Sequence, residues 1–181
     1  MKLSQLEDIN HSQLPVLCAI AKVKKISAAL ELGSGLLSTP LFLNRDYFPN
    51  LTRLVSLEND LVWANKVIDK VGQDDRWTYK AQAGEIVDLA KTVNISDFDL
   101  CLIDDSTTIE GRSATIKYVT RTNIGSAILV LHDFDIEIYR ASVWEKLNTF
   151  TLWKVSPGVG VAWLGNTLTP DEYEDICREA I

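Results

Sequence analysis

Polar side chains in this sequence gather directly after short apolar segments that have the composition of buried strands. Glycine, carboxylate, amide and imidazole groups of this kind can hold and react with a small polar ligand. Five such places follow one another along the chain: residues 31–38, 58–59, 82–85, 104–107 and 132–133. Ligands of open α/β sheets bind beyond the carboxyl ends of the strands, where strand order reverses, so we expect these residues to meet at one edge.

The first of these places contains two closely spaced glycines. Gly33 and Gly35 allow a tight turn and a close approach of the backbone to a ligand, and the helix that follows offers free N–H groups. The pattern Gly33-x-Gly35-x-x-Ser38 is an incomplete dinucleotide fingerprint, so a tight turn without a ligand is an equal alternative. We predict that Ser34 and Ser38 belong to the cofactor-binding loop.

Two glutamates indicate which cofactor the loop would hold. Glu58, followed by Asn59, ends the second apolar segment, where its carboxylate can accept hydrogen bonds from both hydroxyls of a ribose. Glu58 could equally be a helix N-terminal carboxylate, with Asn59 or Asp60 as the cap. Glu31 would repel a pyrophosphate and favour a cationic ligand such as a sulfonium, which points to S-adenosylmethionine rather than NAD. The alternative is that Glu31 points elsewhere and pairs with a lysine.

Three further residues at this edge have side chains suited to catalysis. His132 could act as the base that deprotonates a hydroxyl near neutral pH, or it could be a hydrogen-bonded histidine at a strand end. Asp104 and Asp133 could hold a divalent cation such as Mg²⁺ through oxygen ligands, or they could cap helices and turns. We predict His132, Asp104 and Asp133 as catalytic residues and Asp104 and Asp133 as metal ligands.

Apolar strands alternate with amphipathic helices along the chain, which is typical of βαβ units and a parallel sheet. Strands are expected at residues 28–32, 54–58, 77–82, 98–103 and 127–131. Helices are expected at 13–24, with Ser12 as the cap, and at 36–47, 60–71, 85–93, 110–121 and 136–147. Two last strands, 150–155 and 159–164, are joined too closely for a parallel crossover and must be antiparallel. A final helix begins at Pro170, capped by Thr169.

These elements predict an α/β fold: a Rossmann-like, doubly wound, mostly parallel sheet with an antiparallel C-terminal strand pair. We expect a single domain over residues 1–181. Its parts would be an N-terminal helical segment (1–27), a core (28–164) and a C-terminal helix (165–181).

The run Ala29-Leu30-Glu31-Leu32-Gly33-Ser34-Gly35 resembles the E-x-G-x-G motif of class I S-adenosylmethionine-dependent methyltransferases. Residues 98–104 and 127–133 are similar to the fourth and fifth strands of that family, and the final antiparallel pair is similar to its reversed last strand. The subgroup that this chain resembles most is the small-molecule O-methyltransferases, in which "IDG" and "HD" motifs close strands four and five.

The resemblance implies methyl transfer from S-adenosylmethionine to a small-molecule acceptor, at oxygen. It implies roles for matching positions: Glu31, Gly33 and Gly35 at the methionine part of the cofactor, Glu58 at the ribose, Ala83, Gly84 and Glu85 beside the adenine, and Asp104 near the methionine amino group or the reaction centre. Some relatives bind a divalent metal after strands four and five, which makes Asp104 and Asp133 candidates here.

The chain departs from the family pattern at three places. Leu37 stands at the third glycine, Asp105 at the "IDG" glycine, and Thr107 or Thr108 where a histidine is often found. These departures bear on metal binding and catalysis more than on cofactor binding. A cofactor-binding module without catalysis, acting as a subunit or interaction domain, is therefore the alternative, and an NAD-linked oxidoreductase is a third reading.

Composition and charge exclude other classes of function. The net charge is −7. The one basic cluster, Lys22, Lys24 and Lys25, is typical of the solvated end of a helix. We therefore do not expect a nucleic-acid partner. No segment has the ~18 apolar residues of a membrane helix. The three cysteines form no metal-binding or disulfide pattern. We expect a cytoplasmic location without a membrane partner, and the oligomeric state stays open.

Overall fold

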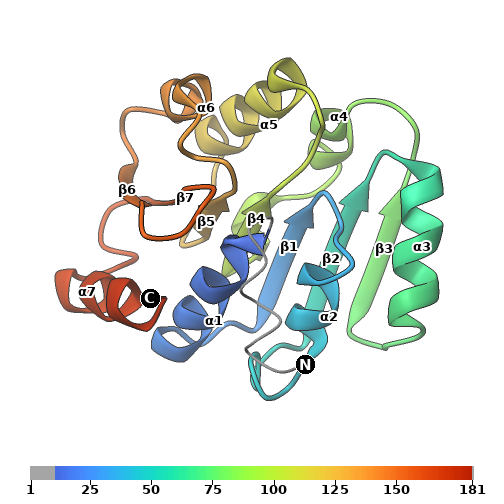
Figure 1. The fold of residues 1–181 in the computed structure, drawn as a ribbon, viewed down its shortest axis with the longest axis horizontal. Helices are drawn as coiled ribbons and strands as arrows, with labels where there is room; N and C mark the ends of the chain where they lie inside the picture. The colour runs from blue at the N-terminus through green and yellow to red at the C-terminus, as the bar shows by residue number, and fades with distance from the viewer. Residues whose placement is uncertain (1–10, 181) are drawn as a thin grey trace.

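A seven-stranded sheet lies between two layers of helices in the computed structural model, which describes residues 11–180 (Figure 1). The strands are β1 (Ala28–Leu32), β2 (Arg53–Glu58), β3 (Trp77–Ala81), β4 (Leu100–Ile103), β5 (Ile128–Leu131), β6 (Asn148–Leu152) and β7 (Val159–Trp163). The helices are α1 (Gln13–Val23), α2 (Ser38–Leu43), α3 (Leu61–Val71), α4 (Ile86–Ala90), α5 (Ile109–Arg121), α6 (Glu137–Ser142) and α7 (Pro170–Glu179), with a short 3-10 turn, η3 (Ile95–Asp97).

The strand order is β3-β2-β1-β4-β5-β7-β6. The first five strands pair in parallel, whereas β7 pairs antiparallel with both β5 and β6. The chain moves outward from β1 to β3 and then returns to the other side of β1 with β4, so the strand order reverses between β1 and β4. The predicted fold class is therefore confirmed.

Alternate residues of the central strands pack into two separate cores, as the period of a strand requires. Ala29 of β1 lies in the core beneath α1, α2 and α7. Leu30 and Leu32 of the same strand lie in the core beneath α4, α5 and α6. The central strands are thus buried on both faces, and the edge formed by their carboxyl ends is the place where polar residues can gather.

Several predicted elements are shorter than expected, among them the helix expected at 85–93, which is only α4. The helix expected at 36–47 is only α2, and Asn44 turns the chain by accepting a hydrogen bond from the N–H of Asp46. The helix expected at 136–147 ends at Ser142, because the N–H of Trp144 bonds to Thr120 Oγ1 instead of continuing the helix. The sixth strand ends at Leu152, since residues 153–158 make the turn to β7.

The predicted helix caps have mixed outcomes. Asp60 caps α3 by accepting from the N–H groups of Val62 and Trp63, and Thr169 caps α7. The prediction that Ser12 caps α1 is wrong, because its hydroxyl donates to the carbonyl of Pro157 at 2.6 Å instead. This bond fixes the start of α1 to the β6–β7 turn. No helix among residues 11–180 is long and apolar enough to cross a membrane.

Candidate active site

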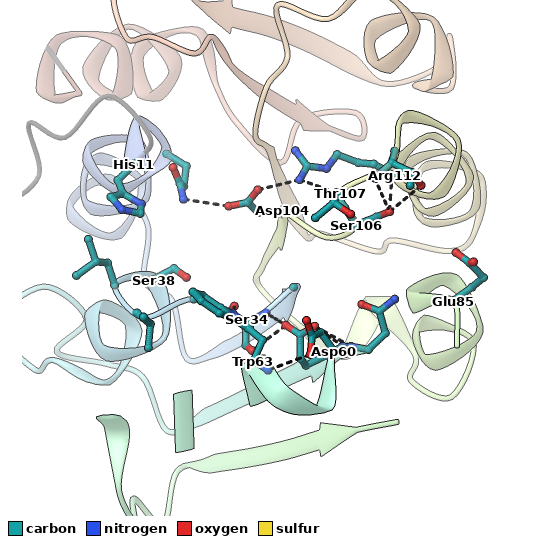
Figure 2. A pocket seen from close by; sticks show the side chains of 18 residues that line it. His11, Ser34, Ser38, Asp60, Trp63, Glu85, Asp104, Ser106, Thr107 and Arg112 are labelled. Atoms are coloured by element: carbon teal, nitrogen blue, oxygen red, sulfur yellow. Dashed lines mark hydrogen bonds and ion pairs between the residues drawn. The ribbon is translucent and has the colours of Figure 1, made fainter. Parts of the chain in front are cut away.

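A cavity of about 700 Å³ opens at the carboxyl edge of the sheet, over the point between β1 and β4 where the strand order reverses (Figure 2). Its volume lies in the range of roughly 300–1,000 Å³ that is usual for small-molecule sites. Seven of the residues predicted to bind a cofactor line it: Gly33, Ser34, Gly35, Ser38, Glu58, Asn59 and Asp104. The structure therefore brings together residues that are up to 71 positions apart in the chain.

Gly33 is the point where the loops after β1 and β4 touch. Its φ is +83°, and a Cβ atom added there would lie 2.3 Å from the carbonyl oxygen of Asp104 and 2.7 Å from Cα of Asp105. Both neighbours are backbone atoms that cannot rotate away. Only glycine fits this position, so the contact fixes Asp104 at the floor of the cavity.

Glu58 organises the other side of the cavity. It is 5% exposed, and its Oε2 accepts from the N–H and the hydroxyl of Ser34, both at 3.0 Å. Its Oε1 accepts from the N–H groups of Asn59 and Asp60. The hydroxyl of Ser34 also lies 2.8 Å from the hydroxyl of Tyr79, so Ser34 has a second partner if a ligand takes its place at Glu58.

Glu31 does not line the cavity, which corrects the expectation that it faces the ligand. It shares a strand face with Ala29, so its side chain points beneath the loop toward α2 rather than out of the sheet edge. Its carboxylate is fully buried and accepts from the hydroxyls of Ser38, Thr39 and Ser56 at 2.6–2.8 Å. Burial raises the pKa of Glu31 to about 7, against the opposing effect of these hydroxyls.

Asp104 is the carboxylate that faces the cavity in place of Glu31. Its Oδ2 accepts from the amide of Gln13 at 3.1 Å, and its Oδ1 lies 3.0 Å from Nδ1 of His132 and 3.2 Å from Nη2 of Arg112. Glu58, Asp60 and Glu85 also line the cavity. The four carboxylates outnumber the one guanidinium in the lining, that of Arg112, so the lining favours a cationic group in the ligand.

His132 and Asp133 contact Asp104 and its neighbours from behind the cavity lining. His132 is 6% exposed, and its Nε2 is buried without a partner among residues 11–180. Asp133 pairs with Arg112 at 2.6 Å. The three predicted catalytic residues do lie together, but the geometry places only Asp104 in the cavity wall.

Ala83 and Gly84 also lie outside the cavity wall. Both are exposed, and the carbonyl of Gly84 accepts a hydrogen bond from the side-chain amide of Asn59 at 2.7 Å. Glu85, which was expected beside the adenine together with them, does line the cavity. The segment after β3 thus borders the site next to Asn59, as its position at the same sheet edge predicts.

No protein-family model matches this sequence, and no curated protein matches it significantly. Solved structures do match its fold. An O-methyltransferase from Bacillus cereus in complex with SAH aligns with a TM-score of 0.61 over 90% of this chain and 86% of its own, at 14% identity. The chain has the class I methyltransferase fold.

Two further solved structures support this assignment of the fold. Human methyltransferase-like protein 13, in complex with SAH, aligns over 94% of this chain and 90% of its own with a TM-score of 0.60 and 16% identity. Spermidine synthase, in complex with the transition-state analogue AdoDATO, aligns over 92% of this chain and 66% of its own with a TM-score of 0.58 and 12% identity. The class I methyltransferase fold therefore covers nearly the whole chain.

The cavity of this methyltransferase fold also contains residues that the sequence did not single out. They are His11, Gln13, Trp63 and Arg112. Trp63 donates from its indole to the carbonyl of Ser34 at 2.7 Å and so holds the glycine loop in place. Gln13 is 2% exposed, with its Oε1 buried and without a partner among the described residues. The one sequence signal was their position beside the sheet edge: Gln13, Trp63 and Arg112 lie in the first turn of α1, α3 and α5, and His11 lies just before α1.

Proposed function

We propose that this protein transfers a methyl group from S-adenosylmethionine to a small-molecule acceptor, at oxygen. The observation that carries the proposal is the cavity at the β1–β4 switch point, which is lined by both the Gly33–Gly35 turn and the carboxylates Glu58 and Asp104. Class I methyltransferase folds that hold SAH or SAM support it by analogy.

The residues present fit this cofactor. Glu58 offers its carboxylate to the ribose hydroxyls, since the Ser34 hydroxyl that occupies it can keep its contact with Tyr79. Asp104 Oδ2 and the unpartnered Gln13 Oε1 are acceptors for the amino group of the methionine part. The cofactor, when bound, supplies an electrophilic methyl on a sulfonium, and the chain's task is to align an acceptor with it.

An oxygen acceptor also requires removal of its proton. His132 is the predicted base, but its Nδ1 faces Asp104, its Nε2 is buried, and the residue does not line the cavity. His11 lines the cavity. We therefore assign proton removal to His11, and we assign His132 and Asp133 to holding Asp104 in place.

Replacing His11 by glutamine is expected to lower turnover of a hydroxyl acceptor about 100-fold, because general-base catalysis contributes on this scale. The affinity for S-adenosylmethionine should stay within about twofold. SAH release followed by mass spectrometry measures the first quantity, and calorimetry measures the second. An unchanged turnover in His11→Gln would remove His11 from the reaction.

Replacing Glu58 by glutamine is expected to weaken binding of S-adenosylmethionine at least about tenfold, since hydrogen bonds to a charged group contribute about 1.5–3 kcal/mol. Asp69→Asn is the matched control, because Asp69 is exposed on α3 away from the cavity and the change removes the same charge. Thermal unfolding of both variants separates lost affinity from lost structure. Equal affinity in the two folded variants would contradict the role of Glu58.

The proposed activity is tested by incubating the protein with S-adenosylmethionine and pooled hydroxyl-bearing small molecules. SAH formation reports transfer to any member of the pool. Acceptor-dependent SAH that disappears in Glu58→Gln supports the proposal. Cofactor binding without turnover over a broad pool of phenols, catechols and sugars would instead indicate a protein that binds the cofactor without catalysis. No feature of the site supports that alternative.

A further inference from the structure

Arg112, in the first turn of α5, reaches across the site to Asp104 after β4 (Figure 2). It also contacts Asp133 after β5. Its Nη1 lies 2.6 Å from Asp133 Oδ2, and its Nη2 lies 3.2 Å from Asp104 Oδ1. Its side chain is 9% exposed, whereas those of Asp104 and Asp133 are 23% and 29% exposed, so the guanidinium is the shielded partner of both ion pairs. One guanidinium therefore bridges the two aspartates that were predicted to hold a metal.

The same two aspartates and His132 have ligand atoms within 4.8 Å of one another. Carboxylate oxygens and an imidazole nitrogen are a donor set that a divalent cation could use. In this structure, however, Oδ1 of Asp104 and Oδ2 of Asp133 are both engaged by the guanidinium, and Nδ1 of His132 faces the same two oxygens. The residues present do not fit a metal, because a fixed cation already lies among its ligands.

Three further contacts hold the guanidinium in this place. Its Nε donates to the carbonyl of Asp105 at 2.5 Å, and its Nη2 donates to the carbonyl of Ser106 at 3.1 Å. The ring of Tyr139, from α6, lies 5.6 Å below the guanidinium carbon. A planar, permanently charged group with several directed donors suits this arrangement better than a mobile ammonium would.

The backbone around Arg112 is strained in a way that these contacts explain. Ser106 and Asp133 are the two non-glycine residues with positive φ among residues 11–180, at 56° and 54°. Such conformations persist where the surroundings fix them. Both residues accept a hydrogen bond from Arg112, which ties the ends of β4 and β5 to α5.

We propose that Arg112 takes the place of the divalent cation between Asp104 and Asp133, so that the resident cation of this site is a side chain and the protein works without a metal. Arg112 is then a positioning residue: it neutralises the aspartates and leaves Oδ2 of Asp104 facing the cavity with Gln13. Its relevance to turnover rests on the proposed function, whereas the exclusion of a metal does not.

The test is a titration of the protein with Mn²⁺, followed by the loss of the free-ion electron paramagnetic resonance signal. The wild type should show no stoichiometric binding at millimolar Mn²⁺. Arg112→Ala removes the cation and leaves the two carboxylates and His132, so it should bind one Mn²⁺ per chain at least tenfold more tightly. Thermal unfolding of Arg112→Ala should then move upward in Mn²⁺.

Two control variants make the result specific. Arg112→Lys keeps a positive charge and should gain no Mn²⁺ binding. Asp133→Asn added to Arg112→Ala should cancel the gain. If Arg112→Ala does not fold even with Mn²⁺, Arg112→Gln takes its place, because it keeps a long polar side chain without the charge.

One Mn²⁺ bound tightly by the wild type and lost in Asp133→Asn would overturn the proposal. A folded Arg112→Ala or Arg112→Gln that gains no Mn²⁺ binding would also overturn it. Once an acceptor is known, turnover of the wild type should be unchanged by EDTA, and activity that EDTA abolishes and Mg²⁺ restores would contradict the proposal. Absence of any turnover would count against the proposed function alone, since the Mn²⁺ titration decides the role of Arg112 by itself.

Discussion

Replacing Gly33 by alanine is expected to lower the free energy of unfolding by about 3 kcal/mol. A left-handed backbone costs a non-glycine residue about 1–2 kcal/mol, and forcing extra atoms into a packed site costs about 1–3 kcal/mol. Both costs apply at Gly33, where φ is +83° and the new Cβ would meet backbone atoms of Asp104 and Asp105 at 2.3–2.7 Å. Urea unfolding measures the loss.

Gly165→Ala is the control that separates these two costs. Gly165 also has a positive φ, +57°, but nothing lies within 4 Å of an added Cβ atom. It should lose only the backbone cost of about 1–2 kcal/mol. The remaining difference measures the contact between the loops after β1 and β4. Equal losses in the two variants would mean that this contact is not as tight as the structure has it.

Gly33→Ala should also weaken cofactor binding beyond its effect on stability. The added Cβ pushes the β1 loop away from Asp104, and Asp104 is one of the two acceptors assigned to the methionine amino group. Calorimetry at a temperature where the variant is fully folded measures this effect. Affinity equal to that of the wild type would show that the two loops need not touch for the cofactor to bind.

The stability of wild type is expected to fall between pH 4.5 and pH 7 because of Glu31. The pKa of this carboxyl is about 7 in the folded chain, against an ordinary value of 4.5. The folded state therefore holds the proton more tightly than the unfolded state, and deprotonation favours unfolding across this window. This difference between the folded and unfolded pKa corresponds to about 3 kcal/mol. The folded state has lost this amount of stability once the pH is above 7.

Glu31→Gln isolates the contribution of this carboxyl. The amide keeps the shape and the hydroxyl partners without a charge, so the free energy of unfolding of the variant relative to wild type should rise by about 3 kcal/mol from pH 4.5 to pH 7.5. Glu145→Gln, at an exposed position, should run parallel to wild type. Asp105, whose pKa burial raises to about 6, is present in all three chains and cancels in the comparison. A flat difference for Glu31→Gln would mean that Glu31 is not buried in the folded chain.

The elements and most of the cofactor-binding loop could be predicted because local patterns determine them. The strands were recognised from short apolar runs, and the rule that ligands lie beyond the carboxyl ends selected Gly33, Ser34, Glu58 and Asp104. The same strand period also determines where Glu31 points, since it shares a face with Ala29. The prediction that Glu31 faces the ligand was therefore wrong about the direction of its side chain. The alternation of side chains along β1 already places Glu31 on the face of Ala29.

Arg112 could not be predicted from the sequence. It lies in an amphipathic helix where an arginine is ordinary on the solvated side, and only the packing of α5 against the ends of β4 and β5 turns it toward Asp104 and Asp133. His132 is the converse case. Its position after β5 was correct, but the direction of its ring depends on partners from β4 that the sequence does not place.

The central claim is that the cavity binds an adenosyl sulfonium, and calorimetric titration with S-adenosylmethionine, SAH and NAD tests it most directly. We predict micromolar binding of S-adenosylmethionine and SAH, little or no binding of NAD, and a loss of affinity in Glu58→Gln but not in Asp69→Asn. Absence of binding by either adenosyl compound, or tighter binding of NAD, would contradict the claim and leave only the fold.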